Sequence, residues 1–333
     1  MGLSEESNEH LSLSIARSLV CTVLSLSFIT GVPGNSFVIW TICGRMTQRP
    51  PTVVLILHLA IADLLVLITL PIWIYSFANA WPFELEACKA LAFVIYSSMY
   101  ASIFLVMALS FERFMAVFYP FAVQHWKYKM ASNVVVSAIW ILAIAFGAII
   151  IPFQETDDTE VGLQCTARIY PNGRAQEVAC CLLETLVGFI MPFAFISVCY
   201  ICVGKRIGQM TCPLKRRSAR LITSIVVAFC LCWLPHHVFN LISVASALIE
   251  DSYPEMSEAL RKISAIGVYI VGSVAFISSC INPLLYAFAS RNIQSSVRIT
   301  KLSRLFEQMS PSERKKPTCP NGKEENLTST EMT

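Results

Sequence analysis

Charged residues are scarce in this chain. Only 14% of its 333 residues are Asp, Glu, Lys or Arg, whereas 55% are hydrophobic and the mean hydropathy is +0.61. This balance excludes an ordinary soluble domain, in which about a quarter of the residues are charged. A large soluble helical enzyme would also need helices with one polar face, and stretches such as 137–153 have no such face. The chain is therefore expected to lie in a membrane.

Other absences narrow the function. His58, His236 and His237 have no carboxylates at metal-ligand spacing, so no enzyme is expected. The sequence shows no internal repeat, whereas many transporters are built from matching halves; a membrane transporter remains the alternative from a different class. Residues 1–14 are acidic and polar, where a cleavable signal peptide would begin basic and then turn apolar. The first apolar helix is expected to act as its own insertion signal.

Seven apolar runs are each long enough to cross a bilayer, which takes about 20 residues. They lie near 17–43, 53–79, 88–111, 130–152, 178–203, 219–249 and 263–288. The expected fold class is an all-α membrane protein, a seven-transmembrane-helix bundle with a short amphipathic helix eight. The expected parts are an extracellular N-terminus (1–16), the bundle (17–288), the amphipathic membrane-surface helix (289–306) and a disordered cytoplasmic tail (307–333).

Lys and Arg are distributed unequally between the two sides of this bundle. Six of the 25 fall on one side, namely Arg17, Lys89, Arg168, Arg174, Arg261 and Lys262. The rest fall on the other side, and the acidic loop residues lean toward the side with six cations. Because cytoplasmic loops carry the excess of Lys and Arg, we expect the N-terminus outside the cell and the C-terminus inside, in a multi-pass protein of the plasma membrane.

Thirteen cysteines are mostly scattered within the apolar runs, where a buried thiol behaves as a small apolar residue. Cys88 and Cys165 fall on the outer side near helix ends, in an oxidising compartment. We expect them to form a disulfide that joins the second outer loop to the top of the third helix. Cys180 and Cys181 are the competing candidates, although they fall about one turn into the fifth run.

Each apolar run contains a residue that hydrocarbon alone would not favour. In chain order these are Gly34-Asn35, Leu59-Ala60-Ile61-Ala62-Asp63-Leu64, Ser102 with Glu112-Arg113-Phe114, Trp140, Pro192 with Tyr200, Cys232-Trp233-Leu234-Pro235 and Asn282-Pro283-Leu284-Leu285-Tyr286. A proline in mid-membrane deletes a backbone hydrogen bond, and an Asn beside it needs a packed or wet interior. Together, the ordered set resembles the rhodopsin-like family of G-protein-coupled receptors over residues 17–306.

The resemblance implies a sodium ion beside Asp63 in the inactive state. An ionised carboxylate inside the membrane costs several kcal/mol unless it is paired. The residues that the family brings to this site are Asp63, Ser102, Ser279, Asn282 and Asn35. No other cofactor is expected. The alternative is a protonated, hydrogen-bonded Asp63 without an ion.

The resemblance also implies an activation switch. Arg113 would pair with Glu112 at rest, then leave it and face the C-terminal helix of a heterotrimeric G protein. The other switch residues are Tyr200, Trp233, Pro235, Pro283 and Tyr286. The triplet Glu112-Arg113-Phe114 departs from the Asp-Arg-Tyr that is usual in the family. Glu112 keeps the carboxylate, but Phe114 lacks the hydroxyl group of the tyrosine. The alternative is that Arg113 is a cation that extends to the lipid headgroups.

Longer stretches look like leukotriene B4 receptors, at 31–40, 98–102, 183–186, 233–241 and 276–283. That resemblance implies an anionic lipid mediator, leukotriene B4, signalling through inhibitory G proteins in chemotaxis and inflammation. Such a ligand needs an apolar slot, polar groups for its hydroxyls and a cation for its carboxylate. Phosphorylated serines and threonines of the tail would recruit arrestin; a solvated linker is the alternative for this segment.

The ligand-binding residues expected on this basis are Tyr100, Glu184, His237 and Asn240, facing the bundle interior, with Arg168 and Arg174 of the outer loop as cations. Arg261, Lys262 and His236 are further candidates for the cation. Glu184 has a second explanation, a structural bond to a neighbouring helix. A receptor of the same fold for a chemoattractant peptide is the alternative function, since acidic outer segments suit a basic peptide.

Overall fold

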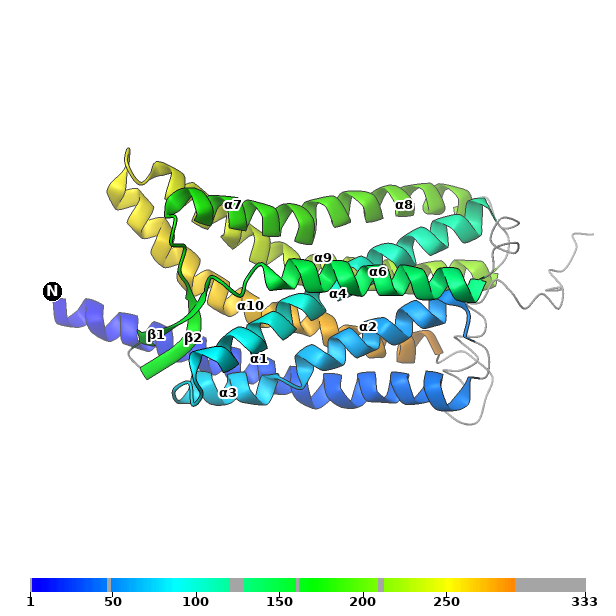
Figure 1. The fold of residues 1–333 in the computed structure, drawn as a ribbon, viewed down its shortest axis with the longest axis horizontal. Helices are drawn as coiled ribbons and strands as arrows, with labels where there is room; N and C mark the ends of the chain where they lie inside the picture. The colour runs from blue at the N-terminus through cyan, green and yellow to red at the C-terminus, as the bar shows by residue number, and fades with distance from the viewer. Residues whose placement is uncertain (1, 47–48, 120–127, 160–161, 209–212, 291–333) are drawn as a thin grey trace, which may run out of the picture.

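The chain folds almost entirely into helices that lie side by side, with one short hairpin of strands (Figure 1). The computed structural model describes residues 2–46, 49–119, 128–159, 162–208 and 213–290. Its elements are α1 (Gly2–Arg45), α2 (Pro51–Leu67), α3 (Leu70–Ala78), α4 (Leu85–Phe118), α6 (Tyr128–Ala148), β1 (Gln154–Thr159), β2 (Gly162–Arg168), α7 (Arg174–Thr185), η1 (Leu186–Ile190), α8 (Met191–Gly208), α9 (Pro213–Ile249) and α10 (Pro254–Ser290). Most of the expected amphipathic helix (289–306) and all of the tail (307–333) lie outside the described residues.

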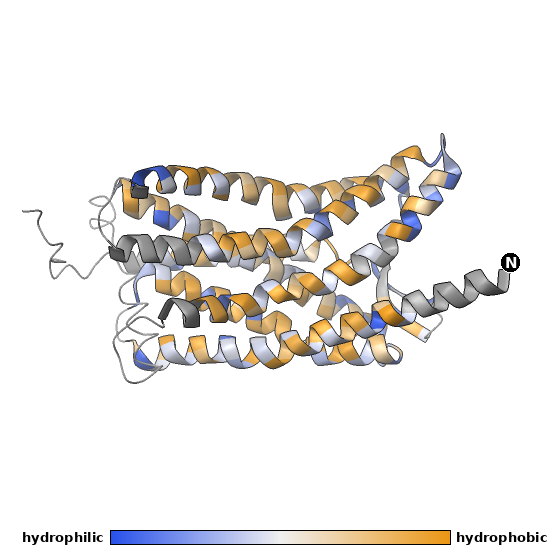
Figure 2. Ribbon diagram, turned by 180° about the vertical axis from the view of Figure 1, so that it is seen from behind, coloured by the Kyte–Doolittle hydropathy of each residue, from blue (hydrophilic) through white to orange (hydrophobic). Residues whose placement is uncertain are grey.

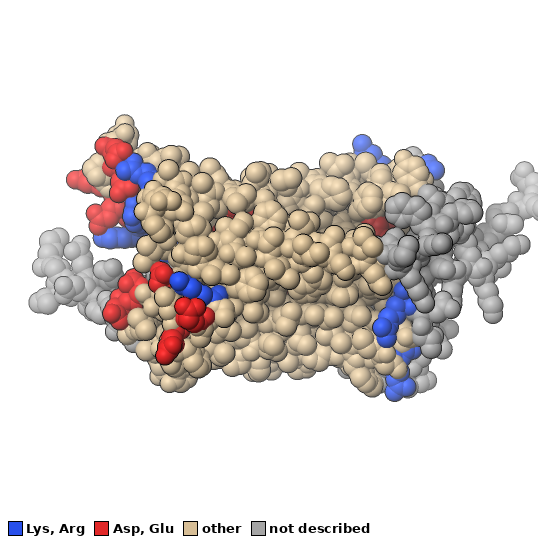
Figure 3. Space-filling model, in the orientation of Figure 1, with Lys and Arg blue, Asp and Glu red and all other residues tan. Residues whose placement is uncertain are grey.

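Hydrophobic residues predominate along the helices between the two ends of the bundle (Figure 2). Large hydrophobic side chains are exposed along it: Ile141 and Leu231 are each 67% exposed, and Ile29 is 65% exposed. Leaving such a side chain in water rather than burying it costs about 1.5–3 kcal/mol, so hydrocarbon is the natural solvent of this surface. Lys, Arg, Asp and Glu gather at the two ends (Figure 3). The chain is a helical membrane protein, as its composition predicts.

Five helical segments are long and apolar enough to cross a membrane, counted over the described residues. They are Ser14–Arg45, Pro51–Ala78, Leu85–Phe118, Arg174–Arg206 and Val226–Ile249, and they coincide with five of the seven predicted runs. The other two runs lie in α6 and α10, whose apolar parts are shorter, Ser132–Ala148 and Ile270–Leu285. α1 begins at Gly2, well before the predicted start at residue 17.

Helix packing closes the bundle. α1 packs against α2 and α10, α2 against α4, α4 against α6 and α8, and α9 against α7 and α10. Asn35 joins α1 to α10, because its Nδ2 donates to the carbonyls of Gly31 (3.0 Å) and Ser279 (2.9 Å). Gly34 makes this close approach possible: a Cβ atom there would lie 2.9 Å from the Cβ of Pro283. A side chain at position 34 would push α10 away from α1.

Prolines shape several of the helices. α2 ends at Leu67 because Pro71, in the first turn of α3, has no N–H for the carbonyl four residues earlier. The π-helical turn η1 precedes Pro192 in the helix that α7 and α8 form. Pro235 lies inside α9 and Pro283 inside α10, without interrupting either helix. These are the positions at which the backbone has one hydrogen bond fewer and bends most easily.

The β1–β2 hairpin covers one end of the bundle, which we call the hairpin end. Its strands pair antiparallel. Cys165 on β2 forms a disulfide with Cys88 in the first turn of α4, with the two Cα atoms 5.6 Å apart. The predicted disulfide is therefore confirmed, and the competing Cys180 and Cys181 are free thiols on α7.

Gln164 fixes the hairpin to α3. Ser76 Oγ donates to Gln164 Oε1 at 2.9 Å, and Gln164 Nε2 donates to the carbonyls of Ser76 (2.9 Å) and Asn79 (3.2 Å). The backbone N–H of Trp81 donates to the carbonyl of Leu163 at 2.7 Å. The disulfide of Cys165 and the hydrogen bonds of the neighbouring Gln164 and Leu163 fix the position of β2. Arg168 at the end of β2 is therefore held in place as well.

Cys88→Ala is expected to lower the thermal stability of the purified protein in detergent. The disulfide links residues 77 positions apart, and a crosslink of this kind stabilises a fold by about 2–4 kcal/mol. The measurement is thermal unfolding followed by tryptophan fluorescence. Cys180→Ala, which removes a free thiol near the same end, is the matched control. Equal melting temperatures for the two variants would show that the crosslink does not stabilise the fold.

Candidate functional site

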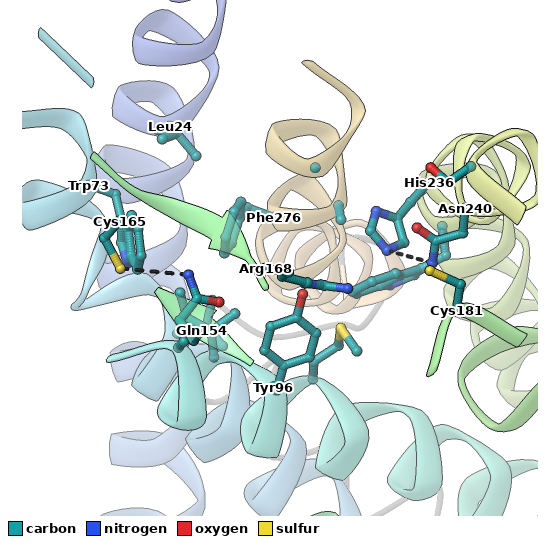
Figure 4. A pocket seen from close by; sticks show the side chains of 18 of the residues that line it. Leu24, Trp73, Tyr96, Gln154, Cys165, Arg168, Cys181, His236, Asn240 and Phe276 are labelled. Atoms are coloured by element: carbon teal, nitrogen blue, oxygen red, sulfur yellow. Dashed lines mark hydrogen bonds between the residues drawn. The ribbon is translucent and has the colours of Figure 1, made fainter. Parts of the chain in front are cut away.

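A cavity of about 760 Å³ lies beneath the hairpin, within the roughly 300–1,000 Å³ usual for small-molecule sites (Figure 4). Its walls come mainly from α1, α3, α4, α9 and α10. Apolar side chains lining it include Leu24, Val66, Trp73, Phe77, Ile95, Met99 and Phe276. Polar side chains lining it include Tyr96, Gln154, Gln164, His236, Asn240, Ser243 and Ser264. The cavity therefore suits a molecule with both apolar and polar parts.

Arg168, the last residue of β2, places a positive charge in this cavity (Figure 4). Its Nη1 donates to Oε2 of Glu184 at 2.9 Å, and its guanidinium lies over the ring of Tyr96, 5.1 Å from the ring centroid. Burial alone would lower the pKa of Arg168, but attraction to the Glu184 carboxylate outweighs burial and raises the pKa above its usual value. Arg168 is therefore a permanent cation.

Glu184 joins three parts of the structure. It lies on α7 and is 7% exposed, and its Oε1 is 2.9 Å from Nε2 of His236 on α9. The same Nε2 is 3.5 Å from Nδ2 of Asn240, one turn farther along α9. A buried carboxylate needs partners of this kind, because an unpaired charge away from water costs several kcal/mol. The structural bond proposed as one explanation of Glu184 is present, and ligand contact by this residue stays a prediction.

Tyr100 and His237 lie beside the large cavity. Tyr100 is 5% exposed and, with Glu184, lines a smaller cavity of about 30 Å³. His237 is 2% exposed and stacks on Phe189, with ring centroids 5.1 Å apart. Neither side chain is part of the wall of the large cavity, and ligand contact by Tyr100 and His237 stays a prediction.

Among the residues that the structure describes, three arginines line the large cavity: Arg17, Arg168 and Arg261. Arg174, predicted to bind the ligand, lies away from this lining at the start of α7. Its guanidinium donates to the two carboxylate oxygens of Asp251 at 2.6 and 2.9 Å. These hydrogen bonds lower the pKa of Asp251. Of the predicted ligand-binding residues, the structure brings Arg168 and Asn240 to the cavity wall.

Arg17 is not among the ligand-binding residues expected from the sequence, where it counts only as an outer cation. The sequence does carry a signal for it. The buried side of α1 runs through Val20, Leu24 and Ser27 at spacings of three or four residues. Arg17 lies three residues before Val20 and so continues this side of the helix toward the hairpin end.

A second polar cluster surrounds Asp63, which is 1% exposed in α2. Its Oδ2 accepts a hydrogen bond from Asn282 Nδ2 (2.8 Å) and its Oδ1 one from Ser102 Oγ (3.2 Å). Ser102 and Ser279 also line the large cavity. Asn35 reaches the cluster through the Ser279 carbonyl, and its Oδ1 is buried without a hydrogen-bond partner in the described part of the chain. These carboxylate, hydroxyl and amide oxygens are the ligands that small hard cations prefer.

Arg113 lies near the end opposite the hairpin. Its Nε is 2.8 Å from Oε2 of the adjacent Glu112, and the two side chains are only 11% and 14% exposed. Its Nη2 donates to Oγ1 of Thr52 on α2, so the guanidinium joins α4 to α2. Phe114, in place of the family's usual Tyr, stacks on Phe118 with ring centroids 4.7 Å apart. Arg113 is paired with Glu112, and the role of this pair in a switch stays a prediction.

The other predicted switch residues lie on α8, α9 and α10. Trp233 on α9 is 8% exposed, lines the cavity, and its ring centroid is 6.0 Å from that of His236. Tyr200 on α8 is partly buried and packs against the main hydrophobic core. The side chain of Tyr286, in the last described part of α10, lies outside the described side chains.

The model of the family "7 transmembrane receptor (rhodopsin family)" matches residues 34–286. The matched stretch contains both polar clusters, the disulfide and the hairpin. It begins at Gly34, which packs on α10, and ends at Tyr286, the last residue of the motif that follows Asn282.

Individual relatives cover most of the chain. Leukotriene B4 receptor 1 from Homo sapiens is 32% identical over 298 residues, which make up 89% of this chain and 84% of that protein. The C3a anaphylatoxin chemotactic receptor from Danio rerio is 30% identical over 308 residues, 92% of this chain and 81% of that protein. Chemerin-like receptor 2 from Mus musculus is 27% identical over 305 residues, 89% and 83% of the two chains. A receptor rather than an enzyme, the chain belongs to the rhodopsin family of seven-transmembrane receptors.

Proposed function

We propose that this receptor responds to an anionic lipid mediator of the leukotriene B4 kind and signals through inhibitory G proteins in chemotaxis and inflammation. The observation that carries the proposal is the cavity, an apolar chamber of about 760 Å³ with arginines and hydrogen-bonding groups on its wall. A lipid with one carboxylate and hydroxyls along an apolar chain has matching parts. The similarity to leukotriene B4 receptor 1 of Homo sapiens and Bos taurus supports the same ligand class.

Apolar contact would supply most of the binding free energy, at about 25 cal/mol per Å² of apolar surface removed from water. A hydrogen bond from an arginine to the carboxylate would add about 1.5–3 kcal/mol. The hydroxyls would bond to His236 and Asn240 on α9. A fatty acid without hydroxyls would fill the same chamber but leave these groups without a ligand partner, so the site favours the hydroxylated lipid.

A chemoattractant peptide is the second candidate, because acids gather at the hairpin end. Glu250, Asp251 and Glu258 would attract a basic peptide, and the C3a and chemerin-like relatives bear names of that kind. These acids already pair with arginine or lysine side chains of the receptor, and the chamber is mostly apolar. The lipid is therefore the better match. Membership of a receptor family leaves the transporter alternative without support.

In the proposed receptor, the helices containing Ser132–Ala148 and Ile270–Leu285 complete a bundle of seven spans. The hairpin end faces outside the cell, because most Lys and Arg fall on the opposite side. The protein then lies in the plasma membrane with residues 1–16 outside. The segment 289–306 follows as an amphipathic helix on the inner leaflet, and arrestin binds the phosphorylated tail.

Signal transfer in this proposal depends on α9. Trp233 contacts the cavity and lies two residues before Pro235, where a missing backbone hydrogen bond lets the helix bend. Bending of α9 would open the end where Arg113 lies. Arg113 would then leave Glu112 and Thr52 and face the G protein. The ligand drives this change only by binding the two arrangements with different affinity.

A sodium ion at Asp63 in the resting state is part of the same proposal. The convergence of Asp63 with Ser102 and Asn282, and the unpartnered Oδ1 of Asn35, support it. The ion would balance the buried carboxylate charge, which otherwise requires a proton. Because Ser279 and Ser102 also line the cavity, agonist and ion would influence each other's affinity.

Leukotriene B4 is expected to suppress cyclic AMP at nanomolar concentrations in cells that express the receptor, and pertussis toxin should abolish the response. Arg113→Ala should abolish signalling but keep agonist binding, because Arg113 lies at the far end of the bundle from the cavity. Arg45→Ala, which removes an exposed arginine at the same end, is the control. Silence from wild-type protein shown to be at the cell surface would remove the ligand assignment and make a chemoattractant peptide the next test.

Asn240→Ala is expected to weaken agonist potency by about 10- to 100-fold, the effect of losing a buried hydrogen bond of about 1.4–3 kcal/mol. Ser246→Ala is the matched control, because Ser246 is a buried polar residue of α9 that bonds to Ser257 instead of lining the cavity. Concentration–response curves corrected for surface expression measure the effect. Equal losses for both variants would indicate that the helix, rather than a ligand contact, had been disturbed.

Replacing sodium chloride with N-methylglucamine chloride is expected to raise agonist affinity about fivefold or more in the wild type, within the usual range of coupling between sites. Asp63→Asn should bind agonist equally well in both salts, because the carboxylate that holds the ion is gone. Radioligand competition in membranes measures both. Salt-independent affinity in the wild type would favour a protonated Asp63 without an ion.

A further inference from the structure

Two of the three arginines that line the large cavity already have carboxylate partners. Arg168 Nη1 lies 2.9 Å from Glu184, which is itself 9% exposed by its side chain. Arg261 Nη2 lies 3.3 Å from Glu250. A ligand carboxylate that approached either arginine would enter a place where a negative charge of the receptor already lies.

Arg17 is different. It is partly buried on α1 and lines the same cavity. No ion pair joins it to any acid among the side chains that the structure describes. Its neighbours one turn away along α1 are Leu13, Ser14, Val20 and Cys21, none of which is acidic. Since α1 is continuous from Gly2, the nearest acid of the same helix, at position 9, lies about 12 Å farther along the axis.

Whether Arg17 or Arg168 binds the ligand carboxylate depends on which existing contacts each arginine would lose. Binding at Arg168 would displace the carboxylate of Glu184, which is buried and also bonded to His236. That carboxylate would be left with one charged partner fewer away from water, a costly state. Binding at Arg17 breaks no ion pair between the side chains that the structure describes, and it gives the arginine a carboxylate partner.

We propose that Arg17 on α1, rather than Arg168, binds the carboxylate of the lipid ligand. This inference rests on the proposed function and makes it more specific, because it fixes the orientation of the ligand. The carboxylate lies against α1 and the apolar chain passes Leu24 and Phe276. The hydroxyls reach His236 and Asn240 on α9 (Figure 4). Arg168 then acts as a structural cation that holds Glu184 and the hairpin in place.

Leukotriene B4 and its methyl ester, which differ only in the negative charge, test the assignment. In the wild type the acid should be at least about tenfold more potent than the ester, as expected for one charge-assisted hydrogen bond. Arg17→Gln should bring the ratio of potencies close to one by weakening the acid while leaving the ester unchanged. Arg17→Lys should retain most of the preference for the acid. Lys89→Gln is the matched control, because Lys89 is a partly buried cation at the hairpin end outside the cavity lining.

The outcomes separate the inference from the proposed function. If wild type prefers the acid and Arg17→Gln keeps that preference at normal surface expression, the assignment of Arg17 is overturned and the ligand class stands. Equal potency of acid and ester in the wild type would also overturn it. If the wild type responds to neither compound, the proposed function fails and the inference fails with it.

Discussion

Hydrocarbon offers a polar group no partner, so the charged and hydrogen-bonding groups inside this bundle must satisfy one another across helices. Two carboxylates show the consequence. Glu184 joins α7 to β2 and α9, and Asp63 joins α2 to α4 and α10. Each interaction links segments far apart in the sequence. Removal of a single partner would leave a charge unpaired in an apolar medium. These contacts therefore determine which helices pack together and how stable that packing is.

The large cavity touches both of these interactions. Its wall at the hairpin end contains Arg168 and His236, which bind Glu184, and its lining also includes Ser102, which binds Asp63. Trp233 lines the same cavity on α9. A ligand that fills the cavity therefore contacts the partners of both carboxylates at once. Because packed helices shift between discrete arrangements rather than deform gradually, such contacts can favour one arrangement over another.

The sequence predicts the positions of residues whose chemistry is unusual for their surroundings. An Asp or an Asn-Pro pair inside an apolar run must face the interior, and Asp63 and Asn282 do so together. Outer cysteines in an oxidising compartment pair, and Cys88 bonds to Cys165. The contacts of Arg174 could not be predicted, because they depend on how the turn between α9 and α10 brings Asp251 to the start of α7.

The hairpin shows a further limit. The spacing of residues 154–168 does not predict that Arg168 lies beside Glu184. The disulfide and the hydrogen bonds of Gln164 to α3 hold it in that position. The orientation of Arg17 toward the bundle interior, in contrast, could be predicted from the sequence. The inward side of α1 repeats at helical spacing through Val20 and Leu24, and following it back one more turn leads to Arg17, the first residue of the apolar run.

The position of α1 in the bundle explains why Arg17 on this helix is suited to bind the carboxylate of the ligand, the role proposed for it. Arg17 and Asn35 are 18 residues apart, which is five helical turns, so they lie on one side of the helix about 27 Å apart. Asn35 and Gly34 fix that side to α10 through a hydrogen bond and close packing. A ligand held by Arg17 is thus anchored to a fixed wall, and its hydroxyls reach across to α9, the helix that bends at Pro235. In the proposed receptor, the distance between carboxylate and hydroxyls would be the property that is recognised, because a shorter lipid would reach only one wall and bind without favouring either arrangement of α9.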